Sequence, residues 1–183
     1  MYIPTGKELI DPFKALEEAG IRTGMTVADF GCGTLGHYVF PAGQLVGPEG
    51  KVYAVDILKS VLAGIESRRK LEGALNVQTV WGDLERMNGI TLSDESVDLG
   101  LLINNLFLSV QKELMVKECV RMIRRGGKMV FIDWKTTGGG FGPDAARRIS
   151  IQDAKKLALG AGLRINNDFT PGPYHYGFVC TKV

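Results

Sequence analysis

Cysteine and histidine are scarce in this chain of 183 residues. The three cysteines, Cys32, Cys119 and Cys180, are widely spaced and form no C-x-x-C pair. Since structural metal sites need clustered ligands, we expect no metal centre. An odd number of unclustered thiols suits a reducing environment, so the expected location is the cytoplasm.

Long apolar runs and a strong charge of one sign are also missing. The longest apolar stretches are strand-sized and interrupted, so we expect no membrane span, and the opening MYIPTGKELI lacks the features of a secretory signal. The net charge is only +2. The basic clusters at 67–70 and 121–128 have no interleaved aromatic residues and fall at expected helix ends, where cations complement the helix dipole. We therefore expect no nucleic-acid partner.

Strand and helix patterns alternate evenly along the whole chain, which predicts a single domain over residues 1–183. Strands are expected at 25–30, 51–56, 76–83, 97–104, 128–134, 163–169 and 176–183. Helices are expected from Asp11-Pro12 to Gly20, after the first strand, from Leu58 to Arg69, from Met115 to Gly126-Gly127, and from the Ser150–Asp153 capping box to Gly162.

Apolar strands separated by helices predict an α/β, Rossmann-like three-layer sandwich with a mostly parallel sheet. The last two strands are joined by a Pro-Gly-Pro turn with no helix between them, so one of them is expected to be antiparallel. Ligands of such sheets bind outside the carboxyl ends of the strands.

A glycine-rich loop follows the first strand, in VADFGCGTLGHYVF (27–40), and Gly31, Gly33 and Gly36 have the spacing G-x-G-x-x-G. This spacing alone fits several nucleotides. The Gly-Lys-Ser/Thr of a phosphate-binding P-loop is absent, which leaves a nicotinamide cofactor or S-adenosylmethionine.

Acidic residues at three successive strand ends favour the second cofactor. Asp29 lies two residues before Gly31, where a carboxylate would repel a pyrophosphate but suit a ligand with an ammonium and a sulfonium group. Asp56 can accept hydrogen bonds from both hydroxyls of a ribose, which fits either cofactor. Asp83 is placed to accept a hydrogen bond from an adenine amino group.

The motifs VADFGCGTLG, KVYAVD, WGDLE and GGKMVFIDW together resemble the class I S-adenosylmethionine-dependent methyltransferases. GMTVADFGCG, GPEGKVYAVDI and PGPYHYGFV are similar to the branch that acts in ubiquinone and menaquinone biosynthesis. The resemblance covers Ile10 to Val183. It implies a seven-stranded sheet with an antiparallel last strand, S-adenosylmethionine as cofactor (S-adenosylhomocysteine as its product) and a small-molecule acceptor.

The resemblance also implies which residues contact the methionine part of the cofactor. Gly31 and Gly33, with Cys32 between them, would line it, and Asp29 would lie near its ammonium group. Asn104, at the end of the fourth strand, would face the same part.

The nucleoside would be held by residues of the next two strand ends. Asp56 would bind the ribose diol, and Ile57 would pack on the adenine. Asp83 and Leu84 would contact the adenine edge.

Direct in-line methyl transfer needs mainly alignment, so no catalytic residue follows from the chemistry. Candidates for a general base or an acceptor wall are His37, Trp134 and His175. His37 is alternatively a solvent-facing residue on the first turn of a helix. His175 is alternatively a hairpin residue hydrogen-bonded to the backbone, and Trp134 alternatively caps the sheet.

Other segments and other functions stay open. Tyr2 and the N-terminal residues are candidates for a lid, and Arg147 and Arg148, which end the 136–148 loop, either bind an anionic acceptor or are solvated. The alternatives to a methyltransferase are an NAD(P)-dependent oxidoreductase and a protein that binds S-adenosylmethionine without catalysis.

Overall fold

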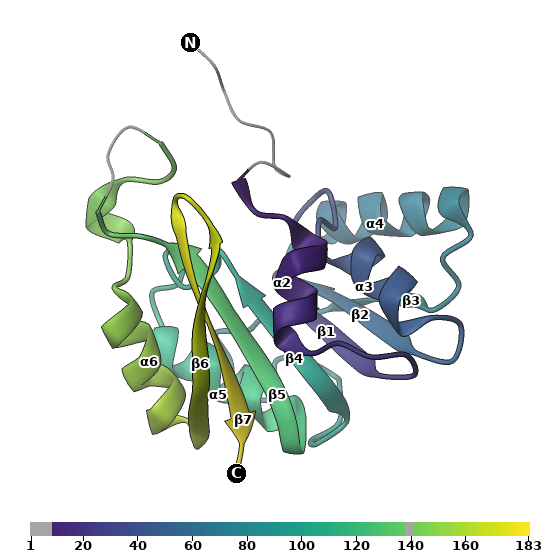
Figure 1. Cartoon of the computed structure of the whole chain (residues 1–183). Helices are drawn as coiled ribbons and strands as arrows, with labels where there is room; N and C mark the ends of the chain where they lie inside the picture. The colour runs from purple at the N-terminus through teal and green to yellow at the C-terminus, as the bar shows by residue number, and fades with distance from the viewer. Residues whose placement is uncertain (1–8, 138–140) are drawn as a thin grey trace.

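Seven strands form one sheet in the order β3-β2-β1-β4-β5-β7-β6 (Figure 1). The computed structural model describes residues 9–137 and 141–183, so the candidate lid residue Tyr2 lies outside the described residues. Among the described strands β7 alone runs in the direction opposite to the other six, as expected of the last strand. The strands are β1 (Thr26–Phe30), β2 (Lys51–Asp56), β3 (Val77–Trp81), β4 (Val97–Ile103), β5 (Ile123–Trp134), β6 (Leu163–Gly172) and β7 (His175–Lys182).

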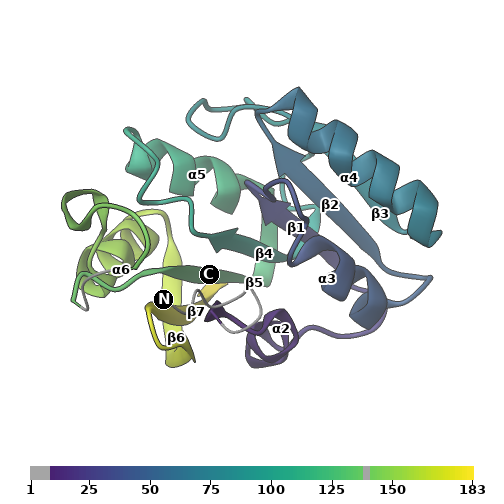
Figure 2. The ribbon, with the colours of Figure 1, turned by 90° about the horizontal axis from the view of Figure 1, so that it is seen from above.

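Helices cover both faces of the sheet, which makes the three layers (Figure 2). The helices are α2 (Pro12–Ala19), α3 (Val39–Val46), α4 (Lys59–Glu72), α5 (Lys112–Met122) and α6 (Ile151–Gly160), with a short 3-10 helix at Ala145–Arg147. One buried hydrophobic cluster joins α2, α3 and α4 to the sheet, and a second joins α5 and α6 to its other face. The α/β Rossmann-like prediction is confirmed.

Local capping residues explain where two helices begin and end. The Asp11 side chain accepts a hydrogen bond from Phe13 N, Pro12 occupies the first turn of α2, and Gly20 ends that helix with a left-handed φ of 73°. The Ser150 side chain accepts from Asp153 N at the start of α6. These signals are short-range, so the sequence predicts them well.

The predicted end of α5 at Gly126-Gly127 is wrong. The helix ends at Met122, and β5 begins at Ile123, which is fully buried and pairs with Val97. The β4–β5 register then shifts between Val97 and Leu99, so that residues 124–127 bulge. Ile123 continues the apolar helical spacing, and for that reason periodicity cannot separate the last helical residue from the first residue of the strand.

Two predicted boundaries in the β3 and β6 regions also differ. β3 stops at Trp81 instead of residue 83, because Gly82 bridges to Ile90 in the loop that follows. The expected Pro-Gly-Pro turn is shorter, since Gly172 still pairs with His175 and only residues 173–174 turn.

A buried carboxylate holds the connection from β3 to β4, which has no helix over residues 82–96. Glu118 of α5 is fully buried and accepts hydrogen bonds from Asn88 N at 2.9 Å and Ile90 N at 3.2 Å. Arg121 forms an ion pair with Glu118 at 2.8 Å and donates to Ile90 O. These bonds fix the segment that follows β3, which borders the site.

Candidate functional site

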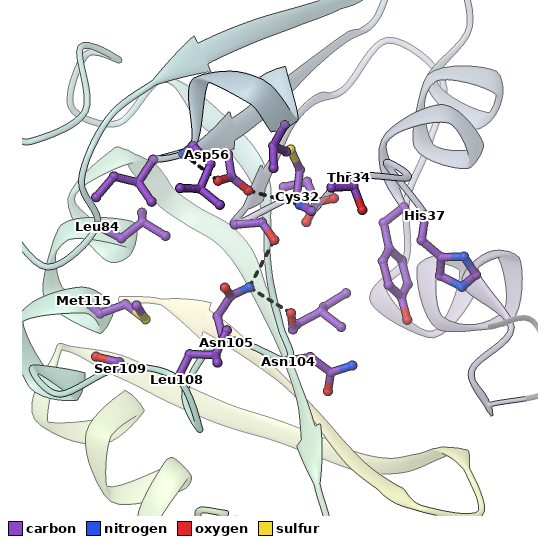
Figure 3. Close-up of a pocket in the computed structure, with 18 of the residues that line it drawn as sticks. Cys32, Thr34, His37, Asp56, Leu84, Asn104, Asn105, Leu108, Ser109 and Met115 are labelled. Atoms are coloured by element: carbon purple, nitrogen blue, oxygen red, sulfur yellow. Dashed lines mark hydrogen bonds between the residues drawn. The ribbon is translucent and has the colours of Figure 1, made fainter. Parts of the chain in front are cut away.

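A cavity of about 810 Å³ lies at the carboxyl ends of the strands (Figure 3). The nine residues expected to bind the cofactor and the three candidates for a base or an acceptor wall all line it: Asp29, Gly31, Cys32, Gly33, His37, Asp56, Ile57, Asp83, Leu84, Asn104, Trp134 and His175. The structure therefore brings the candidates into one place, while their roles toward a ligand stay predictions.

Strand order arranges these residues across the sheet edge. From one side to the other they are Asp83 after β3, Asp56 on β2, Asp29 on β1, Asn104 after β4, Trp134 on β5 and His175 on β7. Neighbouring strands lie about 4.8 Å apart, so five spacings make the row about 24 Å long. The acids occupy one half of the row, and the amide and aromatic side chains occupy the other.

The glycine loop is fixed to the second strand by its own amides. Gly31 N and Cys32 N both donate to Val55 O, at 2.8 and 3.0 Å, and Gly33 N donates to Asp56 Oδ2 at 3.2 Å. Gly31 has a left-handed φ of 77°, which few other residues tolerate. The loop thus bends tightly beneath the cavity.

Asn105 is a site residue that sequence reasoning missed. Its Nδ2 donates to Ile103 O, Phe30 O and Gly31 O at 2.8, 3.0 and 3.2 Å, which ties the end of β4 to the end of β1 (Figure 3). A Cβ on Gly31 would lie 2.3 Å from the Asn105 amide. The one available signal was the Asn-Asn pair at a strand end.

Asp29 is the most perturbed acid of the site. It is 2% exposed, and its Oδ2 has no hydrogen-bond partner. Burial raises the pKa of Asp29 to about 7, and the nearby charge of Asp56 adds to the shift. The carboxylate is thus placed where a cationic ligand group would relieve its burial.

The carboxylates of Asp56 and Asp83 are held by hydrogen bonds from backbone amides. Asp56 accepts from Leu58 N at 2.9 Å in addition to Gly33 N, and Asp83 accepts from Glu85 N at 2.9 Å. Figure 3 shows Leu84, which is buried, on the same side of the cavity as Asp56. Ile57, by contrast, is half-exposed at the rim.

His37 is half-buried and precedes α3, so its expected place on the first turn of a helix is wrong. Its Nε2 lies 3.1 Å from Ile10 O. Gly36 before it has a φ of 55°, and a Cβ there would lie 2.7 Å from Ile65 of α4. The turn at Gly36 is thus closely packed, and His37 after it lines the cavity.

Trp134 and His175 pair across β5 and β7, and their ring centroids are 4.0 Å apart. His175 is 1% exposed, and neither ring nitrogen has a partner among the described residues. The expectation that His175 bonds to the backbone is therefore wrong. Burial lowers the pKa of His175 to about 4, assisted by the charges of Lys135 and Arg148.

Arg147 and Arg148 are not among the residues that line the cavity. Arg148 donates to Pro143 O, Lys135 O and Phe141 O, and so holds the described parts of the 136–148 loop together. The guanidinium of Arg147 lies 5.9 Å from the ring centroid of Phe107. Residues 138–140 of this loop lie outside the described residues.

Buried polar atoms without partners are concentrated at this cavity. Among the described residues such atoms belong to five side chains, and four of the five line it: Asp29, Tyr38, Asn104 and His175. Folded proteins pair nearly all buried polar atoms, so this cluster indicates a site for a polar ligand. No group of three or more potential metal ligands occurs within residues 9–137 and 141–183.

A family model described as "Methyltransferase domain" matches residues 21–158. The chain belongs to the methyltransferase domain family. The match covers three quarters of the chain and includes the glycine loop and Asp29, Asp56 and Asp83.

Solved and curated methyltransferases are similar to this chain. A SAM-dependent methyltransferase from Aquifex aeolicus has 27% identity and a TM-score of 0.90, over 99% of this chain and 94% of that one. A demethylmenaquinone methyltransferase from Lactococcus lactis is 29% identical over 66% of this chain, and an arsenite methyltransferase from Halobacterium salinarum is 29% identical over 63%. The matches span only 46% and 28% of those two proteins, so this chain spans about half the length of curated relatives or less.

Along the part of this methyltransferase-family chain that the structure describes, no helix has the length and apolar character that crossing a membrane requires.

Proposed function

We propose that this chain is an S-adenosylmethionine-dependent methyltransferase that acts on a small-molecule acceptor by direct in-line transfer. The observation that carries the proposal is the buried, unpartnered Oδ2 of Asp29 in a cavity that Asp56 and Asp83 also line. Three carboxylates disfavour a pyrophosphate and favour a nucleoside with a cationic end. The family match and the Aquifex aeolicus structure support the same reading.

The residues present fit this cofactor. Asp29 would lie near the ammonium of its methionine part, beside Gly31 and Gly33. Asp56 would accept from the ribose hydroxyls, because each oxygen of a carboxylate retains acceptor capacity beyond one backbone amide. The backbone bonds to Gly33 and Leu58 fix that carboxylate in advance.

Apolar contacts would hold the adenine. Leu84 is buried at the cavity wall, Ile57 borders the rim, and Asp83 carries an acceptor at the same end. Asn104, just after β4, would contact the methionine part, and its Oδ1 lacks a partner among the described residues.

When bound, S-adenosylmethionine supplies a methyl group on a sulfonium, which reacts with a nucleophile without metal or acid assistance. The chain's own task is then to hold the acceptor in line with that group and to keep water away. Alignment of this kind can supply most of the acceleration. The cavity wall supplies it with buried side chains such as Trp134 and Met115.

An organic small molecule is favoured over arsenite as the acceptor. Arsenite binds soft thiolate ligands. Of the three cysteines only Cys32 lines the cavity, and burial together with Asp29 and Asp56 raises the pKa of its thiol, so it stays protonated. Three free, buried cysteines also support a cytoplasmic location.

Calorimetric titration with S-adenosylhomocysteine and with NAD tests the cofactor. We expect binding of the first only, and at least tenfold weaker binding after Asp29→Asn. Asp168→Asn is the matched control, because it removes one carboxylate from β6 beside Lys155, away from the cavity. Binding of NAD in place of S-adenosylhomocysteine would contradict the proposal.

A second experiment separates an enzyme from a binding protein without catalysis. The protein is incubated with S-adenosylmethionine labelled at its methyl group and a small-molecule extract. We expect a labelled low-molecular-weight product. Tight cofactor binding without any labelled product across such extracts would favour the non-catalytic alternative.

A further inference from the structure

A buried carboxylate at the end of β5 lies beside the cavity without lining it. Asp133 is 1% exposed, and it is absent from the cavity wall although the next residue, Trp134, belongs to that wall. Burial raises the pKa of Asp133 to about 6, while neighbouring backbone amides and the charge of Lys112 act in the opposite direction. A charge is costly in such a place, so its partners indicate what it does.

Both oxygens of Asp133 accept hydrogen bonds from the backbone. Oδ1 accepts from Trp134 N at 2.8 Å, and Oδ2 accepts from Phe107 N at 3.4 Å. An ionised carboxylate is an acceptor at both oxygens, whereas the side-chain amide of an asparagine would turn an N–H toward one of the two donors. The arrangement therefore needs a carboxylate at this position.

Phe107 belongs to the segment of residues 104–109, which follows β4 and forms one wall of the cavity. Four residues of this segment line the cavity: Asn104, Asn105, Leu108 and Ser109. Figure 3 shows these side chains together on one side of the cavity. The end of β5 holds the segment at two points, because Asn104 N donates to Ile132 O at 2.8 Å and Phe107 N donates to Asp133.

Asn104 has a strained backbone between these two points. Its φ is 55°, a left-handed value that only two other non-glycine residues reach in the part of the chain that the structure describes. Its side chain lines the cavity, where Oδ1 has no partner among the described residues. A residue keeps such a conformation only where its surroundings hold it, and Asp133 fixes the chain three residues further on.

We infer that Asp133 is a positioning residue for cofactor binding: its carboxylate holds residues 104–109 as a wall of the cavity and so keeps the Asn104 side chain toward the methionine part of the donor. This inference rests on the proposed function, which assigns that part of the donor to Asn104. Asp133 itself would act through the wall, because it does not line the cavity.

Calorimetric titration with S-adenosylhomocysteine at pH 8 compares the native chain with Asp133→Asn. We expect binding to weaken at least about fivefold, because an Asn104 that is freed from its support must return to the strained conformation when the ligand binds. The matched control is Asp98→Asn. Asp98 also accepts from a backbone amide, Thr26 N, at 2.7 Å, but at the opposite end of the sheet and away from the cavity.

Thermal unfolding of both variants separates a role in binding from a role in the fold alone. Asp98→Asn should lower the unfolding temperature and keep the native affinity. If Asp133→Asn also lowers the unfolding temperature but binds S-adenosylhomocysteine as the native chain does, the inference is overturned. Failure of the native chain to bind S-adenosylhomocysteine would instead count against the proposed function.

Two further titratable side chains act near Asp133. Lys112 of α5 donates to Ser109 O at 2.6 Å, and Tyr176 lies opposite Asp133 in the β5–β7 pairing. Burial, together with the charges of Asp133 and of Asp153 at the start of α6, raises the pKa of the Tyr176 phenol, which therefore stays neutral below pH 8. The amide protons that bond to the Asp133 oxygens thus report the titration of Asp133 itself.

A second measurement covers the case in which Asp133→Asn does not fold. It uses Asp29→Asn, because this variant lacks the other aspartate of the site whose pKa is raised. Amide proton shifts are followed from pH 8 to pH 5. Those of Phe107 and Trp134 should titrate with a midpoint near pH 6, and that of Asn104 should move with the same midpoint as the wall loosens. Titration of Phe107 and Trp134 without Asn104, or of none of the three, would overturn the inference.

Discussion

The Asp29 carboxylate is buried at a cost to the unliganded protein. Its pKa is raised to about 7 by burial and by Asp56, whereas its ordinary value is 3.8. Between these two values the folded state binds more protons than the unfolded state, so stability falls as the pH rises from about 4 to 7. Under the proposed function, a cationic group of the ligand would offset this cost.

Asp29→Asn should therefore stabilise the unliganded protein while it weakens S-adenosylhomocysteine binding. The gain in the free energy of unfolding at pH 8 is expected to reach as much as about 4 kcal/mol. The pKa of Asp29 is raised by about three units, and each unit corresponds to about 1.4 kcal/mol. Urea denaturation at pH 8 and at pH 4 measures it, and the gain should shrink at the lower pH. A loss of stability at pH 8 would show that the carboxylate is paired in solution.

Site residues at strand ends were predictable, and those that depend on strand order were not. Asp29, Asp56 and Asp83 each lie at or just after the carboxyl end of an apolar strand, so the sequence places them at the same sheet edge. Asn105 acts on Phe30 O, 75 residues earlier, and this contact exists only because β4 lies beside β1. The sequence alone does not show that these two strands are adjacent in the sheet.

At the scale of elements, Asn105 joins two strands by hydrogen bonds to three carbonyls. Asn105→Ala should lower the free energy of unfolding by about 1–3 kcal/mol, because buried carbonyls lose their donor. It should also weaken S-adenosylhomocysteine binding, since the Gly31 carbonyl loses its anchor. Asn166→Ala, which removes an exposed amide from β6, is the control for calorimetry and should change neither quantity. Unchanged stability in Asn105→Ala would show that its bonds do not hold the loop.

The connection between β3 and β4 depends on a single buried carboxylate. Glu118→Gln should cost about 2 kcal/mol or more, because Glu118 accepts from Asn88 N and Ile90 N and pairs with Arg121. Thermal unfolding measures the cost.

Glu72→Gln serves as the comparison for Glu118→Gln. It breaks an exposed pair with Arg68, and such pairs contribute about 0–1 kcal/mol. Equal effects of the two variants would mean that Glu118 does not support residues 82–96.

Element boundaries were predicted where a local cap sets them and missed where pairing sets them. Gly20 and Ser150 end and begin helices through bonds within a few residues. Ile123 belongs to β5 because Val97 pairs with it, and Gly172 belongs to β6 because His175 does. Such partners are distant in the sequence or specific to the final register.

For the molecule as a whole, the pKa of His175 moves in the opposite direction to that of Asp29. It is lowered to about 4 by burial and by Lys135 and Arg148. Between pH 6.5 and 4 the unfolded state binds the extra proton, so the His175 contribution to stability is lost as the pH falls through this range. Asp29 acts in the opposite sense over most of the same range, and the two partly cancel.

His175→Gln should remove the pH-dependent contribution of His175 to the free energy of unfolding. The stability of the native chain minus that of the variant is expected to decrease steadily from pH 7 to pH 4.5, as followed by denaturation at several pH values. His37→Gln is the comparison, since His37 is half-buried and its Nε2 lies near Ile10 O. A difference that is independent of pH would show that His175 titrates as an exposed histidine does.

The sheet order divides the proposed site between two stretches of the chain. Residues 29–84 include Asp29, Asp56 and Asp83, whereas Trp134 lies on β5 and His175 on the antiparallel strand β7. Under the proposed function, a lineage of such proteins can diversify in the substances it methylates through mutations in the later third of its gene. The part of the gene that encodes residues 29–84, which bind the methyl donor under the same proposal, would then stay unchanged.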